Sequence, residues 1–109
     1  MEAAATYCMV MTAVDEEAAA EKLAQQLVDA RLVACVQIQE VTSFYAWQGQ
    51  SRRDKEYLLL IKSRQSLYTA IEAFIREHHS YQVPEILQVP VTAGSADYLA
   101  WMREQTRHE

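Results

Sequence analysis

The chain contains few of the residues that interrupt regular structure, and few cysteines. Its 109 residues include two glycines, two prolines and two cysteines. So little glycine and proline excludes a collagen-like or low-complexity chain, and a hydrophobic content of 50% excludes a disordered one. Cys8 and Cys35 lack the paired spacing of a structural zinc site or a redox dithiol. We therefore expect a single domain over residues 1–109, with reduced thiols, in the cytoplasm.

Positive charge and long apolar runs are also scarce. Ten Lys and Arg stand against fifteen Asp and Glu, which gives a formal net charge of −5. Nucleic-acid binding needs clustered cations, and the one cluster, Arg52, Arg53 and Lys55, contains Asp54. No apolar run approaches the roughly 18 residues of a membrane span, and the N-terminus lacks a signal-peptide pattern. The sequence thus predicts no nucleic-acid partner and no membrane span.

The spacing of apolar residues predicts strands and helices in a definite order. Strands are expected at 6–14, at 33–39 and 41–48 as one long bent strand, at 56–62 and at 86–92, with helices at 15–30, 63–79 and 96–106. Asp15 and Ser63 are candidate N-caps, residues 49–55 form a polar turn, and Pro90 indicates an edge strand or a bulge. The order β-α-β-β-α-β with a terminal helix is the ferredoxin-like α+β plan, an antiparallel sheet with two helices on one face.

The first and third predicted strands carry apolar residues on both of their faces. Two helices on one side of a sheet cover only one face, and a short C-terminal helix is too small to shield the other. Because soluble proteins rarely expose a large apolar surface, we expect the second face to pack against copies of the chain in a closed oligomer.

Several segments resemble the CutA divalent-cation-tolerance family. Residues 42–49 (TSFYAWQG), followed by Glu56 and Lys62, are similar to that family's central hairpin, and residues 12–16, 32–35, 78–85 and 98–101 follow its order and spacing. The resemblance implies a ferredoxin-like fold and a homotrimer with the architecture of the PII signalling proteins. It also implies a role in tolerance of divalent metals and binding of copper(II) or other divalent cations. No catalytic activity and no organic cofactor are expected.

The resemblance also implies candidate metal ligands. Residues of the family that match His78, His79 and Glu85 are proposed copper ligands, together with a cysteine where this chain has Met11. A thioether prefers copper(I) to copper(II), so this replacement would shift the metal preference of the site. By residue geometry alone, adjacent histidines on a helix point about 100° apart. Capping of the last helical carbonyls is the alternative role for these histidines.

A second candidate site is a ligand or subunit cleft rich in aromatic residues with a polar tip. Its expected members are Tyr45, Trp47, Glu56, Lys62, Tyr81 and Trp101. Such rings favour interfaces and pockets where the N–H or O–H finds a partner. Two roles are open for these residues. They pack within the trimer, or they bind a small effector, an anion or a partner protein.

Other function classes are disfavoured. The chain has no Ser/His/Asp set and no Gly-rich phosphate loop. An acylphosphatase would need an arginine-bearing anion loop after the first strand, where this chain has the acidic segment 12–16. A copper chaperone would need a Cys-x-x-Cys pair, which is absent.

Overall fold

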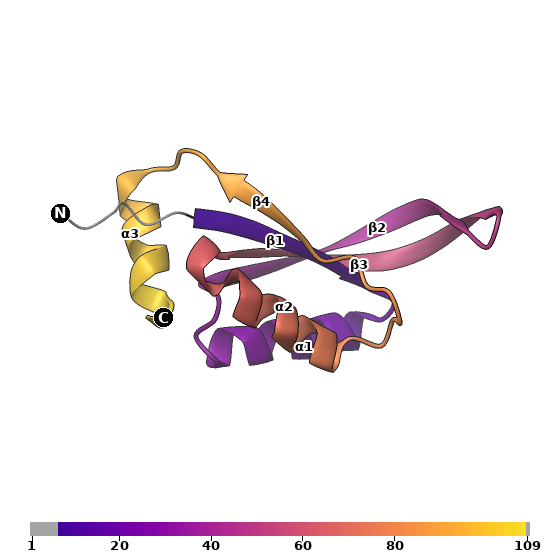
Figure 1. The fold of residues 1–109 in the computed structure, drawn as a ribbon, viewed down its shortest axis with the longest axis horizontal. Helices are drawn as coiled ribbons and strands as arrows, with labels where there is room; N and C mark the ends of the chain where they lie inside the picture. Colours follow the sequence, from indigo (N-terminus) through magenta and orange to yellow (C-terminus); the bar gives the residue numbers. More distant parts are fainter. Residues whose placement is uncertain (1–6, 109) are drawn as a thin grey trace.

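The computed structural model describes residues 7–108, which form a four-stranded antiparallel sheet with two helices beneath one face and a third helix at one end (Figure 1). The elements are β1 (Tyr7–Val14), α1 (Glu17–Asp29), β2 (Cys35–Trp47), β3 (Gln50–Arg64), α2 (Tyr68–His78), β4 (Leu87–Val91) and α3 (Ala96–Gln105), with a 3-10 turn at Gln65–Leu67. The strand order is β2-β3-β1-β4. This arrangement confirms the predicted ferredoxin-like plan, including one long strand over residues 35–47 and an edge position for Pro90 in β4.

The core lies between the sheet and the helices α1 and α2. Alternate residues of the two central strands point toward the helices, and they meet the apolar stripes of both. The buried set includes Cys8, Val10, Val14, Leu59 and Ile61 from the sheet and Leu23, Leu27, Ile71 and Ile75 from the helices. Thr12 is buried on the same side of β1, and its hydroxyl finds no hydrogen-bond partner among the described residues.

The hairpin between β2 and β3 has a shorter turn and longer strands than predicted. The turn was expected at 49–55, whereas β2 ends at Trp47 and β3 begins at Gln50. Gln48 and Gly49 have φ angles of 50° and 77°, so both central residues of the turn are left-handed. Two such residues form the turn type whose twist matches paired strands, which keeps β2 and β3 in register as far as Trp47 and Gln50. Residues 51–55 therefore belong to β3. The hairpin projects beyond the rest of the molecule (Figure 1). With the hairpin included, the molecule measures 52 × 25 × 21 Å.

Both predicted N-caps of the first two helices are wrong. Ser63 lies in β3, where it is buried and donates a hydrogen bond of 2.7 Å to the carbonyl of Leu32. Its place in the sheet, opposite Cys8, outweighs its tendency to begin a helix. Asp15 lies before the cap position of α1, which is Glu16 and makes no side-chain capping bond.

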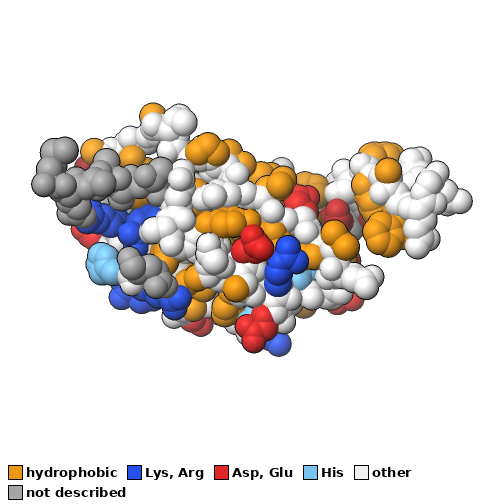
Figure 2. Space-filling model, in the orientation of Figure 1, with side chains coloured by type: hydrophobic (Ala, Val, Ile, Leu, Met, Phe, Trp, Pro, Cys, Tyr) orange, Lys and Arg blue, Asp and Glu red, His pale blue; other side chains and the backbone are white. Residues whose placement is uncertain are grey.

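One face of the sheet carries no helix along most of its length. This helix-free face consists of Met9, Met11, Leu58, Leu60, Leu87 and Val89, which share one side of three paired strands. Leu87 is 55% exposed and Val89 is 39% exposed, whereas the others are half-buried. Figure 2 shows hydrophobic side chains on the body of the molecule and again on the projecting hairpin. No helix within residues 7–108 is both long and apolar enough to cross a bilayer.

Candidate functional site

The connector between α2 and β4 is held to the end of β1 by His79. The pairing of β4 with β1 ends at Leu87 and Met11, so Ala13 lies beyond the last paired residue. His79 Nε2 lies 2.8 Å from the Ala13 carbonyl oxygen, and the Tyr81 backbone N–H donates to His79 Nδ1 at 3.0 Å. Because Nδ1 accepts this bond, the ring proton is assigned to Nε2, which donates to Ala13. Both ring nitrogens of His79 are therefore engaged.

His78 lies apart from this network. It is exposed at the last residue of α2, where its Nδ1 lies 2.8 Å from the carbonyl oxygen of Phe74. Its ring stacks on Phe74 with the ring centroids 4.2 Å apart. The arrangement matches the capping role considered for it, since its ring nitrogen meets a carbonyl of the last helical turn.

The other predicted metal ligands lie around Ala13. Glu85 lies two residues before Leu87, which begins β4 and is paired with Met11. Glu85 and Ala13 do line the same cavity. His79 and Glu85 thus both lie at Ala13, near the end of β1, whereas His78 does not, and Met11 lies two residues earlier in the same strand. Within residues 7–108, no three His, Cys, Asp or Glu side chains form a group that could hold a metal ion.

Two adjoining cavities lie where the connector meets the hairpin. The first, about 320 Å³, is lined by Tyr45, Trp47, Tyr81, Gln82 and Val83. The second, about 350 Å³, is lined by Ala13, Ser43, Phe44, Tyr45, Glu56 and Glu85. Tyr45 contributes to both. We call this pair the hairpin cavities, and their volumes fall at the lower end of the range typical of small-molecule sites.

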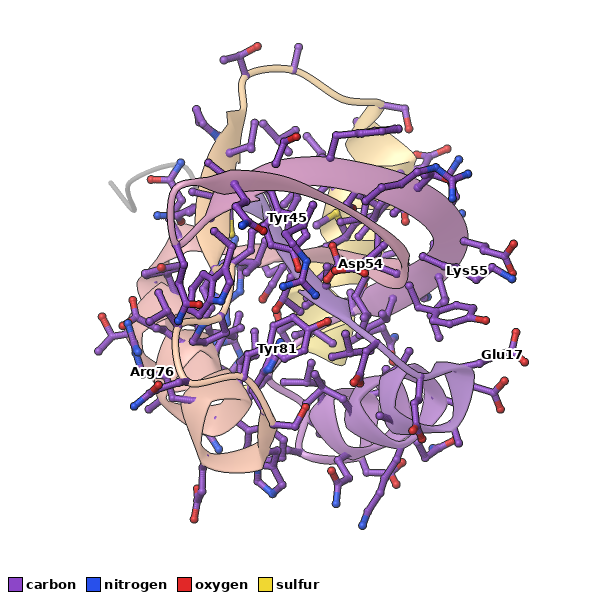
Figure 3. All side chains as sticks on the ribbon, turned by 90° about the vertical axis from the view of Figure 1, so that its right-hand side faces the viewer. Glu17, Tyr45, Asp54, Lys55, Arg76 and Tyr81 are labelled. Carbon is purple, nitrogen blue, oxygen red and sulfur yellow. The ribbon has the colours of Figure 1, made fainter. Side chains whose placement is uncertain are left out.

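The tyrosine hydroxyls of the hairpin cavities are bound to carboxylates. Tyr81 donates to Glu56 at 2.9 Å, which ties the connector to β3, and Tyr45 donates to Asp54 across the hairpin. Figure 3 shows Tyr45, Asp54 and Tyr81 gathered in the middle of the end-on view. The hydrogen bond to Asp54 raises the pKa of Tyr45, and burial followed by the bond to Glu56 raises the pKa of Tyr81. Both phenols are therefore neutral hydrogen-bond donors near pH 7.

Lys62 and Trp101 are not part of the hairpin cavities. The amine of Lys62 lies 5.7 Å from the ring centroid of Tyr98, and that ring lies 5.4 Å from the ring of Trp101. Along β3, Lys62 is ten residues from Arg52, the partner of Tyr45, a separation of roughly 33 Å in an extended strand. The predicted cleft is thus two separate groups of residues within one chain.

Sequence analysis missed several residues of the site, which are Asp54 and the lining residues Ala13, Ser43, Phe44, Gln82 and Val83. Asp54 was assigned to a turn, and only the register of the hairpin shows that it shares a face with Tyr45. Gln82 and Val83 come from the connector, which has no periodicity that would indicate a cavity wall. The alternation of Arg52, Asp54 and Glu56 along an extended strand was the available signal for Asp54.

Comparison with known proteins gives consistent matches over nearly the whole chain. The family described as CutA1 divalent ion tolerance protein matches residues 8–105. The divalent-cation tolerance protein CutA of Thermus thermophilus is 39% identical over 99 residues, which cover 90% of this chain and 96% of that protein. The crystal structure of CutA1 from Oryza sativa superposes with a TM-score of 0.93 at 34% identity, covering 96% of this chain and 97% of that one.

Some relatives are considerably longer. The chloroplastic protein CutA of Arabidopsis thaliana is 40% identical over 101 residues, and the human protein CutA is 41% identical over 91 residues. These matches cover 92% and 83% of this chain. The chain spans 56% of the Arabidopsis protein and 51% of the human one, about half the length of each.

Proposed function

The chain belongs to the CutA1 divalent ion tolerance family, and on this premise we propose that it acts as a non-catalytic homotrimer in the tolerance of divalent cations. The observation that carries the assembly is the helix-free face, where Leu87 and Val89 are 55% and 39% exposed on an edge strand. A continuous apolar face of this kind is stabilised when copies cover it in a closed ring. The resemblance to the family implies that the ring has three members.

The projecting hairpin also supports an assembly. An isolated pair of strands is marginally stable in water. Phe44 is paired with Arg53, beyond Tyr57 where the pairing of β3 with β1 ends, and it is 72% exposed. A neighbouring copy would cover such residues and hold the hairpin in place.

The oligomeric state tests this part of the proposal. We expect light scattering after size-exclusion chromatography to give three times the 12.5 kDa mass of one chain. Leu87→Lys should dissociate the trimer without unfolding the chain, because this side chain is already more than half exposed. Ala73→Asp, on the exposed outer side of α2, is the matched control and should remain trimeric. A wild-type protein that is monomeric at micromolar concentration contradicts the assembly.

We place the metal-binding part of this function, copper(II) binding, at the end of β1, with His79 and Glu85 as ligands and Met11 beside them. Imidazole and carboxylate suit copper(II), and the thioether of Met11 would favour copper(I). A neutral histidine that binds a metal through Nε2 carries its proton on Nδ1. Metal binding by His79 would therefore break its bonds to both Ala13 and Tyr81. These losses oppose binding, so we expect a lower affinity than a preformed site would have.

Calorimetric titration with copper(II) in a non-coordinating buffer tests the ligand assignment. We expect close to one ion per chain, with binding abolished in His79→Ala and in Glu85→Gln. His78→Ala is the matched control and should retain binding, because His78 lies outside the group around Ala13. Loss of binding in the His78 variant, or unchanged binding in the other two, would contradict the assignment.

A second candidate function is that of a PII-like trimer that binds a small effector or a partner protein. The hairpin cavities favour it, since three aromatic residues from two distant segments, Tyr45, Trp47 and Tyr81, line one hollow. We further propose that the protein works in the cytoplasm, because Cys8 and Cys35 are free thiols.

A further inference from the structure

The hairpin cavities combine aromatic surface with negative charge. Tyr45, Trp47 and Tyr81 line the first cavity, and Glu56 and Glu85 line the second, which adjoins it at Tyr45. In the single chain Tyr45 is 40% exposed and Trp47 is 45% exposed, and both lie on the face of the hairpin opposite Phe44, so a ligand can reach both rings while a neighbouring copy covers Phe44. Aromatic side chains that remain accessible beside carboxylates are the typical surroundings of an organic cation.

The hydrogen bonds of the site disfavour an anionic ligand. The hydroxyl groups of Tyr45 and Tyr81 already donate to Asp54 and Glu56, so neither hydrogen is free to bind an anion. The amine of Lys62, which would attract an anion, lies at the other end of the strand against Tyr98.

The charge around the cavities is also predominantly negative. Within residues 7–108, none of the carboxylates of Asp54, Glu56 and Glu85 forms an ion pair with Lys or Arg. Asp15 lies close enough to raise the pKa of Tyr81. Arg52 is paired with Tyr45 in the hairpin, and its positive charge acts to lower the pKa of Tyr45. A second guanidinium, that of Arg53, lies 5.8 Å from the ring centroid of Phe44, so four carboxylates stand against two guanidiniums.

We propose that the hairpin cavities bind a small organic cation with an alkylated ammonium head group, which lies against the rings of Tyr45, Trp47 and Tyr81 and is balanced by the neighbouring carboxylates. This inference rests on the second candidate function, effector binding, and names the ligand class. It shares Glu85 with the proposed copper site, so choline binding is measured in metal-free protein. The head group is attracted to the ring faces by their quadrupoles, and the carboxylates supply the longer-range attraction.

Choline and its uncharged isostere 3,3-dimethylbutan-1-ol are the probes that test the proposal. The chain has two tryptophans, so Trp101→Phe leaves Trp47, within the first cavity, as the one tryptophan, and its emission is excited selectively beyond the absorption of tyrosine. We expect choline to change the Trp47 emission saturably, with about tenfold weaker binding of the isostere because it lacks the charge. The full-length oligomeric protein is used throughout.

Variants separate charge recognition from simple burial. In the Trp101→Phe background, Asp54→Asn keeps an acceptor for the Tyr45 hydroxyl and removes one charge, and we expect it to weaken choline binding about threefold. Tyr81→Leu removes one of the three rings and should weaken choline more than the isostere. Glu104→Gln, on α3 at the opposite end of the molecule, is the matched control and should leave binding unchanged.

Each outcome bears on the proposal differently. Equal binding of choline and the isostere would overturn the organic-cation assignment and leave effector binding standing, with an apolar ligand. Binding of neither probe at millimolar concentration would overturn the proposal. Copper binding is tested by its own titration and by His79→Ala, which removes a ligand that lines neither cavity, so the two proposals can fail separately.

Discussion

Replacement of His79 by alanine should destabilise the protein far more than replacement of His78. His79 makes two hydrogen bonds: one joins the connector to Ala13 in β1, and the other, from the Tyr81 N–H, holds the connector itself. Each contributes about 0.5–1.5 kcal/mol, and the loss leaves the carbonyl of Ala13, a residue 4% exposed, without its partner. We therefore expect His79→Ala to lower the free energy of unfolding by about 2–3 kcal/mol. His78→Ala should cost about 0.5–1 kcal/mol, since that side chain is exposed and its hydrogen bond and ring stacking are both with Phe74 of its own helix.

Two conservative variants divide the effect of His79 between its nitrogens. The amide nitrogen of His79→Gln can replace the donor to Ala13, and the amide oxygen of His79→Asn can replace the acceptor for the Tyr81 N–H. Each variant should recover about 1 kcal/mol relative to His79→Ala. Recovery in both would show that each ring nitrogen contributes to the structure.

Urea unfolding followed by circular dichroism measures these differences. At a slope of about 2 kcal/mol per molar urea, His79→Ala should shift the midpoint down by roughly 1 M, and His78→Ala by less than half of that. All variants must be compared at one protein concentration, because unfolding of an oligomer depends on it. Equal and small effects at the two histidines would refute the assigned roles.

Other changes have expected effects of comparable size. Thr12→Val should leave the free energy of unfolding unchanged or raise it by up to about 1 kcal/mol, because the buried hydroxyl has no partner among the described residues, and a clear loss in urea unfolding would contradict this. Burial raises the pKa of the Cys8 thiol from 9.0 to about 11. The unfolded chain therefore releases this proton first, and stability should fall as the pH rises from about 9 to about 11, less steeply in Cys8→Ala when measured by urea unfolding at each pH. Gly49→Ala should lower stability by about 1 kcal/mol, because Gly49 has a φ of 77°, and an unchanged thermal midpoint would argue against strain at this turn.

The elements with regular hydrophobic spacing were the best predicted. The stripes that contain Leu23 and Leu27 in α1, and Ile71 and Ile75 in α2, are buried against the sheet as expected. Apolar residues on both faces of β1 and β3 also indicated a second face in need of cover, and the structure shows that face without helices. These features depend on periodicity, which each segment carries locally.

The errors fall where a residue's role depends on a distant segment. Ser63 has the chemistry of a helix cap, and its bond to Leu32 keeps it in the sheet instead. Residues 51–55 have the polar composition of a turn, and pairing with β2 makes them a strand. In both cases the local residue preference favoured a cap or a turn, and a contact with a distant part of the chain stabilised a strand instead.

The sequence by itself determined the order of strands and helices, the apolar faces and the family resemblance, because each is carried by the type and spacing of neighbouring residues. Tertiary structure alone decided how the candidate residues group. It separated His78 from His79, placed Glu85 beside Ala13 and moved Lys62 away from Tyr45. The physical reason is that strand register, the path of the connector and the two-residue turn set these distances. These three features depend on other residues than the site residues that they bring together.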